Sequence, residues 1–154
     1  MNRLKHLLGK VLAKYPDLLD HSFHIEYASL SGAFATNAYI APVKEVKIQI
    51  NRSVARASDS VLKGLIASEV SHIVRDRRLT ALGVLIDRVK CEFSTAHRER
   101  DELATDYITV ERGLGVELLA FLEYDESLGE DADGERHEGL TLNDLRQMLV
   151  CELS

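Results

Sequence analysis

The sequence contains no tryptophan, and aromatic residues make up only 6% of its 154 positions. Proteins that hold single-stranded nucleic acids stack the bases on aromatic side chains, so this chain is poorly supplied for that task. It also lacks an excess of positive charge, because 19 basic residues stand against 25 acidic ones and the formal net charge is −6. Nucleic-acid binding needs the opposite sign of charge, and we therefore expect no nucleic-acid partner.

Cysteine is scarce as well. Cys91 and Cys151 lie far apart and form no C-x-x-C motif, which argues against a disulfide framework and against a cysteine zinc site. Two structural thiols in a reducing compartment are the simpler interpretation, and they predict a cytoplasmic protein. The longest uncharged stretch, residues 27–43, contains several polar residues and Pro42, so the sequence predicts no transmembrane segment.

The length predicts one domain, residues 1–154, with a core of its own. Acidic residues are concentrated between positions 122 and 138, where eight acids accompany one base. We interpret residues 122–138 as an acidic loop and residues 139–154 as a C-terminal helix that Thr141 caps at its start. The loop and this helix could form a solvated connection or could fold over a cleft as a flap, and the sequence does not decide between the two.

The hydrophobic pattern changes period along the chain. Apolar residues recur at helical spacing over residues 4–15, alternate with polar residues over 23–27, 38–40 and 46–50, and return to helical spacing from residue 59 onward. The alternating segments predict a small antiparallel or mixed sheet, and their short connections favour a meander or hairpin over a parallel crossover. The sequence therefore predicts an α+β, helix-rich domain with this sheet packed on the central helices.

The predicted helix over residues 59–76 carries two neighbouring stripes. Leu62, Ile66, Val70 and Ile73 form the stripe that should face the core. Glu69 and His72 lie together on the rim of that stripe. A carboxylate beside an imidazole could serve a metal site, with His72 binding the ion and Glu69 activating a water, or the two could form an ordinary hydrogen-bonded pair.

A second predicted helix, over residues 98–114, places carboxylates beside its apolar side. We expect Leu103, Tyr107, Val110 and Leu114 to form its buried stripe. Three acids flank that stripe, namely Glu99, Glu102 and Asp106. Burying a carboxylate without a partner is costly, so a cation or a histidine across the helix interface is expected.

The five residues Ser68-Glu69-Val70-Ser71-His72 resemble the H-E-x-x-H motif on the active-site helix of gluzincin-type zinc metallopeptidases. The downstream run from Glu102 to Asp106 is similar to the E-x-x-x-D glutamate helix of the same group. The following Glu111-Arg-Gly-Leu-Gly also resembles the soluble minigluzincins, whose fold is similar to the catalytic domains of CAAX prenyl proteases and HtpX-like peptidases. The resemblance covers roughly residues 46–124 and implies a zincin-like fold.

The resemblance implies a role for each matching residue. Glu69 would be the general base, His72 and Glu102 zinc ligands, and Asp106 the acid that orients a ligand. Ser68 stands where the family has its first histidine ligand, and a serine hydroxyl binds zinc poorly at neutral pH. This predicts a metallopeptidase-like domain that is inactive or weakly active, with zinc as its cofactor in doubt.

Two alternatives remain open. The chain could be a non-catalytic module that binds a peptide or protein, or it could be an active zinc endopeptidase, either because another residue replaces the missing ligand or because Ser68 is an engineered substitution. We expect His24, His97 and His137 to be ordinary surface or half-buried histidines rather than replacements.

The strand that precedes the motif helix contains Val46, Ile48 and Ile50. In the resembling peptidases such a strand forms the upper edge of the cleft, and a peptide substrate binds by adding a strand to it. These three residues are therefore the predicted substrate edge, although they could also simply pack beneath the helix.

Overall fold

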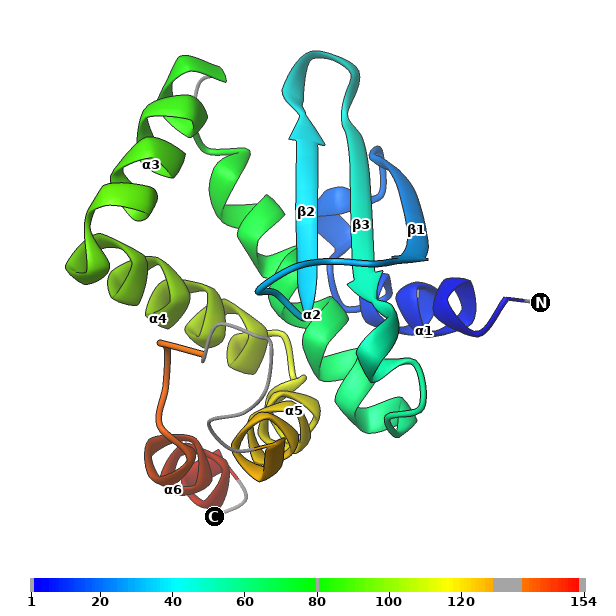
Figure 1. Ribbon diagram of the computed structural model, residues 1–154, viewed down its shortest axis with the longest axis vertical. Coiled ribbons are helices and arrows are strands. Elements are labelled where there is room, and N and C mark those ends of the chain that lie inside the picture. Colours follow the sequence, from blue (N-terminus) through cyan, green and yellow to red (C-terminus); the bar gives the residue numbers. More distant parts are fainter. Residues whose placement is uncertain (1, 80, 129–136, 153–154) are drawn as a thin grey trace.

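The computed structural model describes residues 2–79, 81–128 and 137–152. Within these residues the chain forms six α-helices and three β-strands, in the order α1 (Arg3–Leu12), β1 (Ser22–Ala28), β2 (Ala35–Ile40), β3 (Glu45–Asn51), α2 (Asp59–Asp76), α3 (Ala81–Phe93), α4 (Thr95–Glu111), α5 (Gly115–Leu128) and α6 (Leu142–Glu152). Short 3₁₀ turns lie at Pro16–Leu18, Ala41–Val43 and Arg52–Val54. The predicted α+β, helix-rich domain is confirmed (Figure 1).

Helix α2 is the centre of the molecule. It packs against α1, α4, α5 and the β2 side of the sheet, so that most of its circumference is covered. The predicted core stripe is confirmed, since Leu62, Ile66, Val70 and Ile73 are each fully buried. Ser58 caps the helix through its side chain, which accepts a hydrogen bond from the Val61 N–H and satisfies one of the donors that a helix start leaves open.

The three strands form one mixed sheet with the order β1-β3-β2. Strands β2 and β3 make the expected antiparallel hairpin, but β1 pairs with β3 in parallel rather than with β2. The simple meander is therefore wrong, and β3 lies in the middle of the sheet. Val46, Ile48 and Ile50 on β3 are buried, which agrees with the packing interpretation of these residues.

The central position of β3 overturns the prediction that Val46, Ile48 and Ile50 form the substrate edge. Both edges of β3 are already hydrogen-bonded, to β1 on one side and to β2 on the other. A strand paired on both sides has no free N–H or C=O groups for a peptide. Among the described strands the edges are β1 and β2, and β2 is the one that packs against α2 (Figure 1).

Helix α4 turns a different face to the core from the one predicted. Leu103 and Tyr107 are exposed, whereas Asp101, Thr105, Asp106 and Thr109 are buried together with Val110. Glu99 is exposed, while Glu102 is half-buried. Polar groups can occupy the buried face because they have partners: Asp101, Asp106 and Thr109 contact residues outside α4, and Thr105 donates to the Glu102 carbonyl within the helix.

The C-terminal part agrees with the sequence in one respect and differs in another. Thr141 caps α6 as predicted, because its hydroxyl accepts a hydrogen bond from the Asp144 N–H at 3.1 Å. The predicted acidic loop over 122–138 begins too early, since α5 continues to Leu128. Residues 129–136 of that prediction lie outside the described residues. No helix in the described part of the chain is both long and apolar enough to cross a membrane.

Candidate functional site

Helix α2 delivers the three predicted residues to one small pocket. The pocket has a volume of about 130 Å³ and is lined by Ser68, Glu69 and His72 of α2 and by Glu102 of α4. The helical period explains this, since positions 68, 69 and 72 project from one side of α2. Helix α4 packs directly on α2, so the two motif helices lie side by side as the sequence predicts.

His72 lies between two carboxylates of α4. Its Nε2 is 3.5 Å from Glu102 Oε1, and its Nδ1 is 3.5 Å from Asp101 Oδ2. Only 16% of the His72 side chain is exposed. Asp101 was not among the predicted residues, because the expected buried face of α4 did not include it. One nitrogen of His72 thus faces an orienting acid and the other faces Glu102.

His137 is the main residue that the sequence interpretation missed. It was expected to be an ordinary histidine, yet it lines the same pocket and leaves only 9% of its side chain exposed. Its Nε2 is 2.6 Å from Asp106 Oδ2, and its Nδ1 is 3.6 Å from Glu102 Oε2. No local pattern around position 137 signals this, because the contact joins residues that are 31 positions apart.

Asp106 holds His137 rather than His72. Its Oδ2 also accepts a hydrogen bond from the Leu140 N–H at 2.7 Å, and its side chain is fully buried. Asp106, which the sequence predicts to orient a zinc ligand, thus contacts a histidine outside the motif. His97 and His24 lie elsewhere: His97 contacts Asp87, and His24 is largely exposed beside Glu26.

The charges of the pocket shift the pKa values of its members. Burial by itself lowers the pKa of His72, but the contact and charge of Glu102 outweigh it and the net pKa is raised. Burial likewise lowers the pKa of His137, and the hydrogen bond to Asp106 reverses the effect. Burial raises the pKa of Glu102, yet His72 pulls it below its usual value. The carboxylates of the pocket thus favour the protonated form of both imidazoles, because that form is positively charged.

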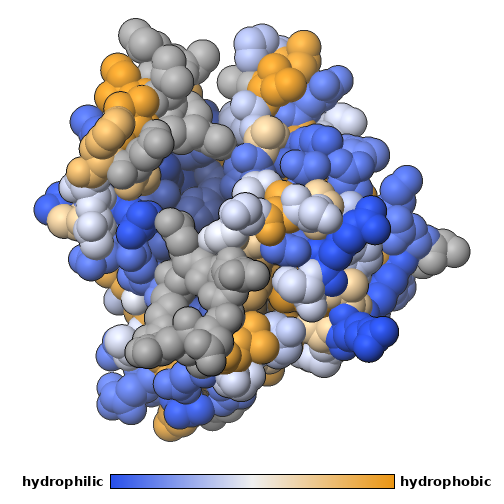
Figure 2. Space-filling model, in the orientation of Figure 1, coloured by the Kyte–Doolittle hydropathy of each residue, from blue (hydrophilic) through white to orange (hydrophobic). Residues whose placement is uncertain are grey.

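Strand β2 forms one wall of the site. Asn37 of β2 donates a hydrogen bond from Nδ2 to Glu69 Oε2 at 2.6 Å, which joins the edge strand to the helix. A second pocket of about 290 Å³ continues past Glu69 and His72 between β2 and α3, and β2 contributes Ala35, Thr36 and Asn37 to it. Figure 2 shows a hollow with hydrophilic residues in its depth between α3 and the β2–β3 hairpin.

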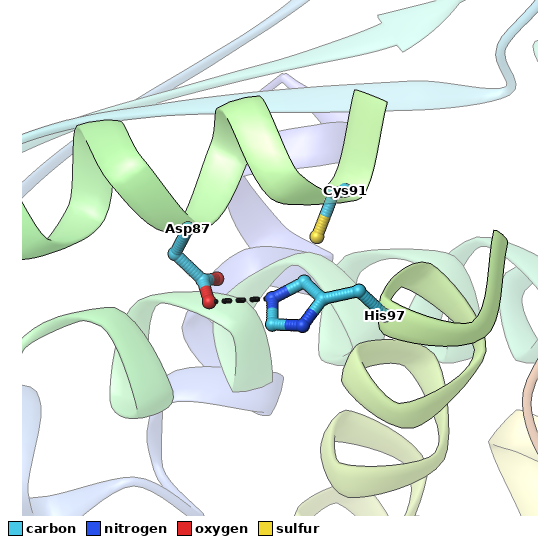
Figure 3. A group of neighbouring side chains, drawn as sticks. All are labelled: Asp87, Cys91 and His97. Atoms are coloured by element: carbon cyan, nitrogen blue, oxygen red, sulfur yellow. Dashed lines mark hydrogen bonds and ion pairs between the residues drawn. The ribbon is translucent and has the colours of Figure 1, made fainter. Parts of the chain in front are cut away.

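A second group of potential ligands lies outside this pocket. Asp87 and Cys91 of α3 face His97 of α4, and His97 Nε2 is 2.8 Å from Asp87 Oδ1 (Figure 3). Arg75 of α2 also contacts Asp87. Because a guanidinium already neutralises this carboxylate, the group is better described as an ion-pair network than as a cation site. Cys91 and Cys151 are both free thiols, as expected, but Cys151 is exposed and Cys91 only half-buried, so neither is a buried structural thiol.

The donors around Glu102 suit zinc. Two ligand atoms on a tetrahedral zinc are roughly 3.3 Å apart, given zinc–ligand bonds of about 2.0–2.1 Å. The 3.5 Å between His72 Nε2 and Glu102 Oε1 is close to this value. Imidazole nitrogen and carboxylate oxygen are both common zinc donors. His72 and Glu102 could therefore hold a zinc ion between α2 and α4, whereas Ser68 offers only a neutral hydroxyl.

Comparison of the chain with protein-family models, with curated proteins and with solved structures finds no match.

Proposed function

We propose that this chain is a zinc-peptidase-like domain that binds a divalent metal between α2 and α4 and accepts an extended peptide along β2. The observation that carries the proposal is the approach of His72 Nε2 to Glu102 Oε1 at 3.5 Å in a pocket that Glu69 also lines. An imidazole, a carboxylate ligand and a separate carboxylate base are the parts that metal-assisted hydrolysis of an amide needs.

Each residue of the site would have a separate role in the hydrolysis. His72 and Glu102 would hold the ion, which when bound supplies Lewis acidity and lowers the pKa of a water. Glu69 would accept the proton of that water and return it to the leaving amine. Asn37 supports this role, because its hydrogen bond to Glu69 Oε2 holds the carboxylate in place.

The edge of β2 supports a peptide substrate. β2 pairs with β3 on one side, and its other side borders the second pocket, so far as the described residues show. An extended peptide could add to this edge by main-chain hydrogen bonds and pass over Glu69 and His72. Such binding does not require the metal, so a non-catalytic peptide-binding module is the second candidate function.

Zinc titration by isothermal calorimetry tests the metal site. The purified protein, stripped with a chelator, should bind one equivalent of zinc, and His72→Ala and Glu102→Gln should each weaken binding by at least 100-fold, since each removes a ligand. His24→Ala is the matched control, because His24 is an exposed histidine on β1 and should leave the affinity unchanged. Failure of the wild-type protein to bind zinc would refute the metal site.

Hydrolysis of a mixed peptide library, read by mass spectrometry, separates the two candidate functions. Zinc-loaded protein should cleave peptides, and Glu69→Gln should retain zinc but lose at least 100-fold of the rate, because it removes the base. Peptides bound but never cleaved, with binding unchanged by chelator, would favour the non-catalytic module instead.

A further inference from the structure

We infer that His137 is the third protein ligand of the metal. It supplies the imidazole that the motif lacks because position 68 is a serine. The inference rests on the proposed metal site between His72 and Glu102. The third ligand would thus come from a residue that follows α5 in the chain, and not from either motif helix. The inference is based on the approach of His72 and His137, which lie in different segments, to the Glu102 carboxylate.

The first step concerns which nitrogen of His137 is available. Asp106 is fully buried, and its Oδ2 is 2.6 Å from Nε2 of His137. A carboxylate accepts hydrogen bonds, so Nε2 carries the proton in the neutral ring and Nδ1 carries the lone pair. That lone pair lies on the side of Glu102, whose Oε2 is 3.6 Å from Nδ1.

The second step is that His72 has a similar arrangement with a longer contact to its aspartate, which also contacts Arg75. Its Nδ1 faces Asp101 at 3.5 Å, and its Nε2 faces Glu102 at 3.5 Å. Each histidine therefore has an aspartate near one ring nitrogen and Glu102 near the other. His72 faces Glu102 Oε1, and His137 faces Glu102 Oε2. Metal-binding histidines almost always have their second nitrogen hydrogen-bonded to a carboxylate or carbonyl, which fixes the ring and raises its basicity.

The third step is that the segment carrying His137 is fastened to α4. Arg98 binds both oxygens of Glu138, at 2.5 and 2.7 Å, and Leu140 N donates to Asp106. Gly139 makes this approach possible, because a Cβ there would lie 2.0 Å from Asp106 Oδ2 and 2.5 Å from His137 Nε2. Phe121 packs edge-on against the His137 ring. The imidazole is thus held in one orientation before any metal binds.

The fourth step concerns Ser68. It is only 6% exposed and lines the same pocket of about 130 Å³ as His137. An imidazole at position 68 would have to share that small space with the His137 ring. The small side chain at 68 and the histidine at 137 are therefore complementary. His72 and His137 face different oxygens of Glu102, so the three side chains would have to close around an ion as it binds. They would then complete the three protein ligands that a catalytic zinc needs, with a fourth position open for water.

Calorimetric zinc titration of four variants tests the inference in the full chain. His137→Ala and His137→Gln should each weaken zinc binding by at least 100-fold, the glutamine being included because its amide can still donate to Asp106. Asp106→Asn, which removes the negative charge beside His137 Nε2, should weaken binding by about 10- to 100-fold. Adding Ser68→His to His137→Gln should recover at least 10-fold of the loss, because the motif position then supplies the missing imidazole. Circular dichroism and melting curves verify that each variant is folded.

The outcomes separate this inference from the proposed metal site. Zinc affinity of His137→Gln within twofold of wild type, while His72→Ala abolishes binding, would overturn the role of His137 and leave the metal site standing. Absence of zinc binding by the wild type would refute both. A cobalt(II)-loaded sample provides a second readout, since the visible absorption of a four-coordinate ion should change in His137→Gln and stay constant in His24→Ala.

Discussion

At the scale of single residues, Ser71 illustrates how a polar side chain can hold the core together. It stands inside the motif and is fully buried. Its hydroxyl is 2.8 Å from the Tyr15 hydroxyl and 2.8 Å from Thr109 Oγ1, so it links the segment after α1 to α2 and α4. Thr109 in turn donates to the Thr105 carbonyl at 2.9 Å. Burial raises the pKa of Tyr15, which keeps the phenol neutral in this chain of hydrogen bonds.

Ser71→Ala should therefore lower the free energy of unfolding by about 2 kcal/mol, because two buried hydroxyls each lose a partner. For a domain of this size that corresponds to a melting temperature lower by about 4–8 °C. Differential scanning calorimetry measures it. Ser60→Ala, on the exposed side of the same helix, is the control and should change stability by no more than about 0.5 kcal/mol. Equal melting temperatures for the two variants would contradict the role of Ser71.

At the scale of elements, α2 and α5 cross in close contact at a glycine. Gly64 of α2 lies against the backbone of α5, and a Cβ at position 64 would be 2.1 Å from the Glu117 carbonyl oxygen. The neighbouring Lys63 forms an ion pair with Glu117 at 2.7 Å. A backbone atom cannot rotate away as a side chain can, so any larger residue at position 64 must push the two helices apart.

Gly64→Ala should destabilise the protein by about 1–3 kcal/mol, because overpacking outweighs the gain in helix propensity. Gly9→Ala is a matched control in α1, where no atom lies within 4 Å of the added Cβ. That variant should be more stable than wild type by about 0.5–1 kcal/mol, since alanine favours the helix. Urea unfolding of both variants measures the difference, and a Gly64→Ala variant that is stabilised like Gly9→Ala would show that the crossing tolerates a side chain.

At the scale of the whole molecule, an ion-pair network fastens α3 to α2 and α4. Arg75 contacts Asp76, Asp87 and Asp101, and Asp87 also faces His97 at 2.8 Å. Burial raises the pKa of the Asp87 carboxyl, but the hydrogen bond from His97 and the charge of Arg75 outweigh this, and the pKa ends below its usual 3.8. The folded state thus binds protons at Asp87 less readily than the unfolded state does.

The consequence is a contribution to acid stability. A carboxyl with a lowered folded-state pKa stabilises the protein above the unfolded value of 3.8, and the effect is lost as the pH falls through the lower folded value. Asp87→Asn should cost about 1–2 kcal/mol at neutral pH, and its difference in stability from the wild type should shrink as the pH falls below 3.8. Melting temperatures from pH 7 to 3 measure this, with the exposed Glu45→Gln as a control. A constant difference at every pH would contradict it.

The predicted elements followed from local patterns. The boundaries of α2, the cap at Thr141 and the buried stripe of Leu62, Ile66, Val70 and Ile73 agree with the structure. The pairing of Glu69 with His72 on one rim agrees as well. These features depend on helix period and on side chains within one turn of one another, which the order of residues contains directly.

Only the tertiary structure decided the features that join distant parts of the chain. The parallel pairing of β1 with β3 makes β2 the edge beside the site, in place of Val46, Ile48 and Ile50. The partners of its polar residues turn α4 so that Asp101 and Asp106 are buried while Leu103 is exposed. His137 reaches Glu102 and Asp106 across 31 to 35 positions of sequence. Sequence patterns record the period of an element, whereas strand order, helix rotation and such contacts depend on the packing free energy of the whole fold.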